Sequence, residues 1–137
     1  MQPAGQVTYA RFVCSAVVPA MAGTAFASWP LMVTVGTEAG VAVEARYKLV
    51  RKFVGIAVDS NNFSEHMRRT VAAVWTASWD EISQLERGPR SLVIQVRHRR
   101  GCRLVARPGR MLPLIQLAAA KGVPIRRVRS TISWNLP

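Results

Sequence analysis

Acidic residues are scarce in this chain of 137 residues, and they end early. Seven Asp and Glu stand against 19 Lys and Arg, which gives a formal net charge of +12. None of the seven lies after Glu86, whereas twelve of the basic residues do, so the last 51 residues carry the whole excess. A surface without a charged partner normally carries both signs interspersed. The asymmetry therefore predicts a local contact with an anionic partner.

Cysteine and histidine are also rare. Cys14 and Cys102 lie far apart, and neither has a second Cys or a His at ligand spacing, which excludes a disulfide framework and leaves a zinc site unsupported. We expect two free thiols. His66 and His98 are 32 residues apart, and no nucleotide-binding, metalloprotease or nucleophile-elbow motif is present. The sequence thus predicts no enzyme, no catalytic residues, no metal and no cofactor.

The longest uncharged segment runs over residues 12–36 and reads FVCSAVVPAMAGTAFASWPLMVTVG. Its 25 residues exceed the roughly 20 that cross a bilayer core as an α-helix. Pro19 and Pro30 are compatible with a membrane helix, so the segment predicts a transmembrane anchor. Two alternatives stay open: a signal peptide cleaved at Ala25-Phe26-Ala27, and a segment buried in the core of a soluble domain.

Basic residues flank this segment unequally. Arg11 alone precedes it, whereas Arg46, Lys48, Arg51 and Lys52 follow it within about 20 residues. Positive charge stays on the cytoplasmic side of a membrane helix. We therefore expect a single-pass protein of the cell membrane with its C-terminal domain in the cytoplasm; the alternative is a soluble cytoplasmic protein.

Local patterns after the apolar segment predict three further elements. Between residues 41 and 49 the apolar side chains occupy odd positions, which is typical of a strand with one buried face. Residues 91–97 and 102–107 flank a turn with Gly101, which predicts a β-hairpin. A helix is expected over residues 112–121, since Gly122 is typical of a helix C-terminus.

Arginines of the acid-free part form the candidate anion-binding set. Alternate residues of a strand share a face, so the hairpin would gather guanidinium groups on one side, where they bind phosphate oxygens in pairs. Nucleic acid suits this segment less than lipid headgroups or an acidic protein, because its helix carries a single cation and Trp134 is its one aromatic residue. The set is Arg97, Arg99, Arg100, Arg103, Arg107, Arg110, Arg126, Arg127 and Arg129.

Trp79-Asp80-Glu81-Ile82, preceded by Arg68-Arg69, resembles the W-x-E-I turn of the bacterial (actinobacterial) pleckstrin-homology-like membrane protein family. The segments SLVIQVR, CRLVAR and AAAKGVPI are similar to the C-terminal half of that family. The resemblance covers roughly residues 41–125, and it departs in having one candidate span where two are common. It implies a partly open β-barrel capped by a C-terminal helix and used for interaction, not catalysis.

The stretch 64–87 is ambiguous from its residues alone. Its apolar side chains recur on one helical face, whereas 71–76 is rich in β-branched and aromatic residues, which favour strands. The resemblance favours strands over 71–86. A long helix over 64–87 in a soluble α/β fold is the alternative.

These observations together predict an α+β fold in which an N-terminal transmembrane helix precedes a small PH-like β-barrel or sheet with a C-terminal helix. Residues 1–38 would form a tail and anchor, and residues 39–137 a basic domain. The predicted function is a non-enzymatic, membrane-anchored interaction module whose arginine-rich hairpin binds lipid headgroups or an acidic protein. The alternative is a soluble nucleic-acid-associated protein, such as a component of a ribonucleoprotein or phage particle.

Overall fold

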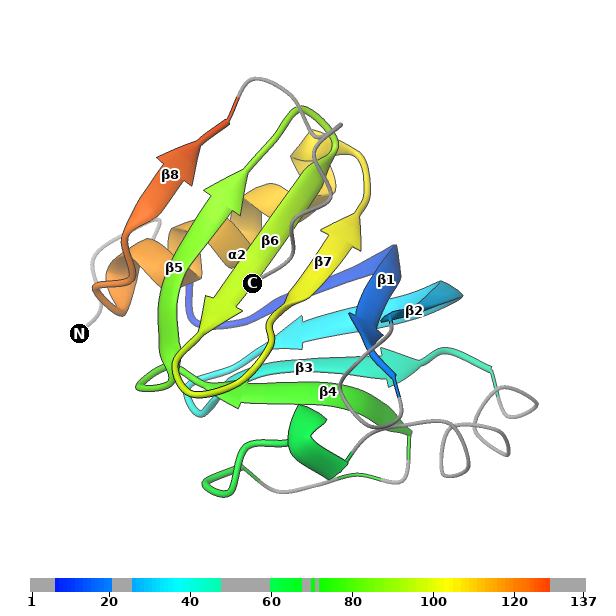
Figure 1. The fold of residues 1–137 in the computed structure, drawn as a ribbon. Helices are drawn as coiled ribbons and strands as arrows, with labels where there is room; N and C mark the ends of the chain where they lie inside the picture. Colours follow the sequence, from blue (N-terminus) through cyan, green and yellow to red (C-terminus); the bar gives the residue numbers. More distant parts are fainter. Residues whose placement is uncertain (1–6, 21–25, 48–59, 68–69, 71, 129–137) are drawn as a thin grey trace.

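The computed structural model describes residues 7–20, 26–47, 60–67, 70 and 72–128. Within them, eight strands form one sheet in the order β4-β3-β2-β1-β7-β6-β5-β8 (Figure 1). The hydrogen-bonded neighbours are antiparallel except β5 and β8, which are parallel. The strands are β1 (Ala10–Pro19), β2 (Phe26–Gly36), β3 (Gly40–Ala45), β4 (Ala73–Ser78), β5 (Ile82–Arg87), β6 (Ser91–Val96), β7 (Cys102–Val105) and β8 (Ile125–Arg127). The helices are η2 (Ser60–Asn62, 3-10) and α2 (Pro108–Ala120).

The sheet changes direction at β1, which belongs to both of its halves. This strand pairs with β2 along its length and with β7 through residues 15–17. In Figure 1 the half made of β1 to β4 crosses the half made of β7, β6, β5 and β8, and α2 lies behind β5 and β6. The core contains fully buried side chains from both halves and from α2, including Trp75, Met32, Leu92, Leu104 and Leu114.

The described residues 12–19 and 26–36 of the apolar segment belong to two paired strands of this sheet, so the predicted transmembrane helix is wrong. Alternate side chains of β1 enter the core, among them Phe12, Cys14 and Val18, while Arg11 stays exposed. Many residues between these positions are apolar as well, which hid the period of two from the sequence. β1 and the second half of β2 contribute buried side chains to the core.

A β-bulge explains how β2 accommodates its proline. Met32 pairs with Cys14 and Trp29 pairs with Ala16, so two residues of β2 lie opposite one residue of β1. One of the two is Pro30, whose missing N–H is tolerated at a bulge. The other, Leu31, has a positive φ of 59°.

The predicted membrane location is overturned together with its helix. In the described part of the chain, neither helix has the length and apolar character that a membrane-spanning helix requires. β1 instead lies between β2 and β7, inside the sheet.

The strand predictions for the rest of the chain are mostly confirmed. Val41, Val43 and Ala45 of β3 are buried, as their odd positions indicated. The stretch 64–87 contains β4 and β5 joined by a tight turn, so the alternative of one long helix is wrong. β-Branched and aromatic residues that pack on both sides of β4 outweigh the helical periodicity, since all six residues of that strand are buried.

The β6–β7 hairpin is confirmed, with Ile94 paired to Cys102 and Ser91 to Val105. Gly101 is required at its turn, because a Cβ there would lie 1.9 Å from the carbonyl oxygen of Ile94. The helix that follows begins at Pro108, four residues earlier than predicted. Proline is favoured in the first turn of a helix, because it has no N–H to leave unpaired there.

Candidate functional site

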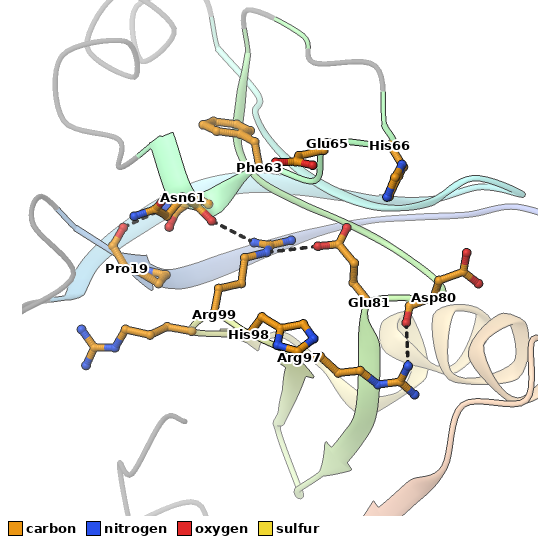
Figure 2. Close-up of a pocket in the computed structure, with 12 residues that line it drawn as sticks. Pro19, Asn61, Phe63, Glu65, His66, Asp80, Glu81, Arg97, His98 and Arg99 are labelled. Carbon is orange, nitrogen blue, oxygen red and sulfur yellow. Dashed lines mark hydrogen bonds and ion pairs between the residues drawn. The ribbon is translucent and has the colours of Figure 1, made fainter.

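A pocket with a volume of about 710 Å³ lies at the turn between β6 and β7 (Figure 2). Its walls are the turn itself (residues 97–100), the segment 61–66, the end of β1 at Pro19, and the turn residues Asp80 and Glu81. The fold brings these parts together because the β4–β5 turn and the β6–β7 turn lie at the same end of the sheet.

Arg99 crosses this pocket and is held on several sides. Figure 2 shows that its Nε donates to Glu81 Oε2 at 3.3 Å and that a terminal nitrogen donates to the carbonyl oxygen of Asn61. The other terminal nitrogen donates to the carbonyl oxygen of Thr76. Its guanidinium carbon lies 5.2 Å from the centre of the Trp75 ring, a cation–π contact. Only 12% of the Arg99 side chain is exposed. These contacts assign Arg99 to the internal structure of the pocket.

Glu81 is the acidic partner in this arrangement. Burial alone would raise its pKa, but hydrogen bonds from Ser64 and Ser78 and the positive charge of Arg99 outweigh it and lower the pKa below its ordinary value. The backbone N–H of Ser78 donates to Glu81 Oε1 at 3.1 Å and the Ser78 hydroxyl at 3.0 Å. The Glu81 carboxylate therefore has two roles: it stabilises the β4–β5 turn through Ser78, and it holds Arg99 in place.

The other arginines of the hairpin turn are less buried. Arg97 is exposed and donates to the carbonyl oxygen of Asp80 at 3.2 Å. The guanidinium of Arg100 lies 4.1 Å from the centre of the Phe26 ring. His66 and His98, distant in sequence, both line the pocket.

The pocket as a whole has no excess of positive charge when its histidines are neutral. Its three arginines face three acidic residues, of which Glu81 is paired with Arg99. Three or more potential metal ligands are not clustered anywhere in the described residues. The hairpin turn is thus a mixed-charge pocket with both histidines at its walls, and not the one-sided cationic face expected from the sequence.

Arg103 is placed differently from the rest of the predicted set. It lies in β7 opposite Val17 of β1 and Val93 of β6, and only 6% of the residue is exposed. A surface contact with a large anionic partner cannot use it.

A second group of arginines gathers at the opposite end of the same strands. The β5–β6 turn, the start of α2 and the end of β8 meet there: the N–H of Ala106 donates to Arg90 O at 3.2 Å, and that of Val128 donates to Arg87 O at 2.9 Å. The top of Figure 1 shows this end of β5, β6 and β8. We name it the arginine end; it comprises Arg87, Arg90, Arg107, Arg110, Arg126 and Arg127.

The arginine end is far more one-sided in charge than the hairpin pocket. Arg87 is half-buried, and the other five arginines are exposed. Among the described residues its one acid is Glu86, whose Oε1 lies 3.9 Å from Arg126 Nη1. The remaining described acids belong to the hairpin pocket, to β3 and to Glu38, which pairs with Lys121 at the other end of α2. Among the described residues, positive charge is therefore concentrated at one end of β5 and α2.

The chain matches no protein-family model, no curated protein and no solved structure. The resemblance to PH-like domains thus stays a prediction. A bent antiparallel sheet followed by α2 is compatible with the arrangement which that resemblance implies.

The predicted arginine set is split by the fold. Arg97, Arg99 and Arg100 lie at the hairpin pocket and Arg103 is buried, while four members lie at the arginine end. Arg129 lies outside the described residues. Sequence reasoning missed Arg87 and Arg90, although the acid-free part of the chain begins just before them.

Proposed function

We propose that this protein is a non-catalytic binding module that places its arginine end against an anionic surface. One observation carries the proposal: six arginines from separate segments of the chain converge at one end of the sheet, where Glu86 is the one acid among the described residues. Like charges held together in this way repel one another, and a polyanionic partner removes that repulsion. The polarised charge would also orient the module as it approaches.

Phospholipid headgroups are the partner that suits this end best. Two apolar side chains are exposed nearby in the sequence: Val105, two residues before Arg107, is 37% exposed, and Leu112, two residues after Arg110, is 39% exposed. Apolar side chains among cations favour the boundary between headgroups and acyl chains. Each arginine near an anionic leaflet contributes about 1 kcal/mol to binding. This contact is peripheral and needs no membrane-spanning segment.

Nucleic acid suits the arginine end less well. Its recognition commonly uses stacked aromatic side chains or a helix with cations along its exposed face. The described residues of the arginine end include no aromatic ring, and α2 carries Arg110 in its first turn with Lys121 just beyond its last.

Vesicle co-sedimentation tests the proposal. Arg90, Arg107 and Arg110 are exposed, so the triple change to Glu removes three contacts with little effect on the core. We expect binding to phosphatidylserine-containing vesicles to fall at least about 100-fold relative to the unaltered protein. Binding of the unaltered protein should weaken as salt rises, and neutral vesicles should not bind.

A matched control reverses the same number of charges elsewhere. Arg11, Arg46 and Arg97 are exposed residues outside the arginine end, and their change to Glu gives the same net charge as the first variant. Equal loss in both variants would mean that binding follows net charge and that the arginine end has no special part. Retention of vesicle binding by the first variant, or tight salt-dependent binding to RNA or duplex DNA without vesicle binding, would overturn the proposal in favour of another partner.

A further inference from the structure

Two arginines face each other across the parallel strands β5 and β8. Arg87 pairs with Arg127 in the register, and the preceding pair is Glu86 with Arg126. Successive residues of a strand point to opposite faces, so the two pairs lie on opposite faces of the sheet. Glu86 and Arg126 combine opposite charges, whereas Arg87 and Arg127 place like charges side by side, which is destabilising. Within the described part of the chain, neither of these two arginines has an acidic partner at ion-pair distance.

Both arginines line one cavity. It has a volume of about 340 Å³, and its walls are Arg87, Arg127, the turn residues Gly88 and Pro89, Pro108 of α2, and Val128. One water molecule takes about 30 Å³ in the liquid, so the cavity is large enough for a phosphate group. The residues that line it include two arginines and two prolines, and no acid.

The start of α2 adds to the positive potential around this cavity. Arg107 is the N-terminal cap residue of the helix and makes no side-chain capping hydrogen bond, and the first turn contains no acid. The N-terminus of a helix carries partial positive charge, so Arg107 and Arg110 lie where cations are disfavoured. An anion bound nearby would relieve both this repulsion and that between the strands.

We propose that the cavity between Arg87 and Arg127 binds a phosphate monoester group. A monoester carries a charge of about −1.5 to −2 and three acceptor oxygens, which matches two guanidinium groups. A carboxylate has one charge and two oxygens, so it satisfies one arginine and leaves the second unpaired. The inference rests on the proposed function, since it assigns the chemistry of one contact within the arginine end.

Titration with inorganic phosphate, followed by NMR of the arginine Nε–Hε groups, tests this site directly. We expect saturable shifts for Arg87 and Arg127, and no saturable shift with acetate at the same ionic strength. Arg127→Lys keeps the charge but loses the two-pronged geometry, so it should weaken phosphate binding about tenfold. Arg107 lies at the same end but outside the cavity, so Arg107→Lys should change the affinity for phosphate by no more than about twofold.

Vesicles of two kinds distinguish a lipid headgroup from a free phosphate compound as the source of the phosphate. Phosphatidic acid presents a monoester and oleate a carboxylate at equal surface charge, and the cavity predicts stronger binding to the first. If inorganic phosphate binds saturably but the two vesicles bind equally, the ligand is a free phosphate compound and not a headgroup.

The lysine variants distinguish a failure of this inference from a failure of the proposed function. Arg87→Lys and Arg127→Lys preserve net charge, so vesicle binding by charge alone should change little in either. Vesicle binding with no saturable phosphate shift would leave the proposed function intact and overturn the cavity. Saturable phosphate binding without any vesicle binding would support the phosphate site and overturn the proposed function. Arg127 is exposed, so its substitution gives a result even if Arg87→Lys does not fold.

Discussion

Arg99 and Glu81 join the tip of the β6–β7 hairpin to the turn between β4 and β5, with Arg99 Nε 3.3 Å from Glu81 Oε2. β4 and β5 follow each other in sequence but belong to different halves of the sheet and are not paired. The Arg97 N–H also donates to the Glu81 carbonyl oxygen at 2.8 Å, so the ion pair adds a side-chain link beside a backbone contact between the two turns.

Removing the charge of Glu81 should make this corner less stable. Glu81→Gln leaves Arg99, with only 12% of its side chain exposed, without its charged partner. We expect a loss of about 2 kcal/mol in the free energy of unfolding at pH 7, measured by urea denaturation. Glu65→Gln is a suitable control, because Glu65 lines the same pocket but is exposed.

The effect of Glu81→Gln should depend on pH. The pKa of Glu81 is lowered in the folded protein from its ordinary value of 4.5, so its stabilisation is complete above that value. It is lost as the pH falls through the lowered pKa, where the carboxylate takes up a proton. The stability difference between the two proteins should be constant from pH 7 to about 5 and shrink below about pH 4. A difference that stays unchanged down to pH 2.5, about two units below the ordinary value, would contradict the assignment.

Gly101 should tolerate no side chain. A Cβ at this position would lie 1.9 Å from the Ile94 carbonyl oxygen, and that backbone atom is fixed by the hairpin. Gly101→Ala should lower the free energy of unfolding by at least about 2 kcal/mol. At Gly109 in α2 a Cβ meets no atom within 4 Å, so Gly109→Ala should raise stability by about 0.5 kcal/mol. Similar urea midpoints for the two variants would show that the turn can relax.

Both thiols should react slowly in the folded protein. Cys14 and Cys102 are free and buried, as the sequence predicted. Burial raises the pKa of the Cys14 thiol to about 11, although a hydrogen bond with Thr34 opposes the shift. At pH 8 only about one such thiol in a thousand is ionised, and the thiolate is the reactive form. Labelling with a disulfide reagent should proceed at the rate of unfolding and become fast in urea. Immediate labelling of either Cys14→Ala or Cys102→Ala under native conditions would show that the remaining thiol is accessible.

The sequence predicted those elements whose signal lies entirely in neighbouring residues. The β6–β7 hairpin and the strand at Val41 to Ala45 were predicted correctly, because a turn glycine and a period of two are local signals. The segment 12–36 was not, because apolar residues also occupy the less buried alternate positions of β1, so the segment resembles any other apolar run. Its bulge at Pro30 and Leu31 removed the remaining alternation.

The arginines were harder to place than the strands. Arg99 and Arg103 belong to the same hairpin as Arg97, yet Arg99 is paired with Glu81 and Arg103 is buried. Glu81 lies 18 residues before Arg99 in the sequence, so no local pattern reveals the pair. The sequence showed that the basic residues are in excess after Glu86. Only the fold shows which of these arginines are buried or paired and which are exposed.

His98 should be a place where the chain can be stabilised. It is exposed and has a φ of 66°, in the left-handed region that costs a side-chain-bearing residue about 1 kcal/mol. His98→Gly removes that cost, so the free energy of unfolding should rise by about 0.5–1 kcal/mol in urea denaturation. His66→Gly is the matched control: it lies in the same pocket without a positive φ, and the greater freedom of glycine in the unfolded chain should lower stability there. Destabilisation of equal size in both variants would mean that His98 makes contacts that outweigh its backbone strain.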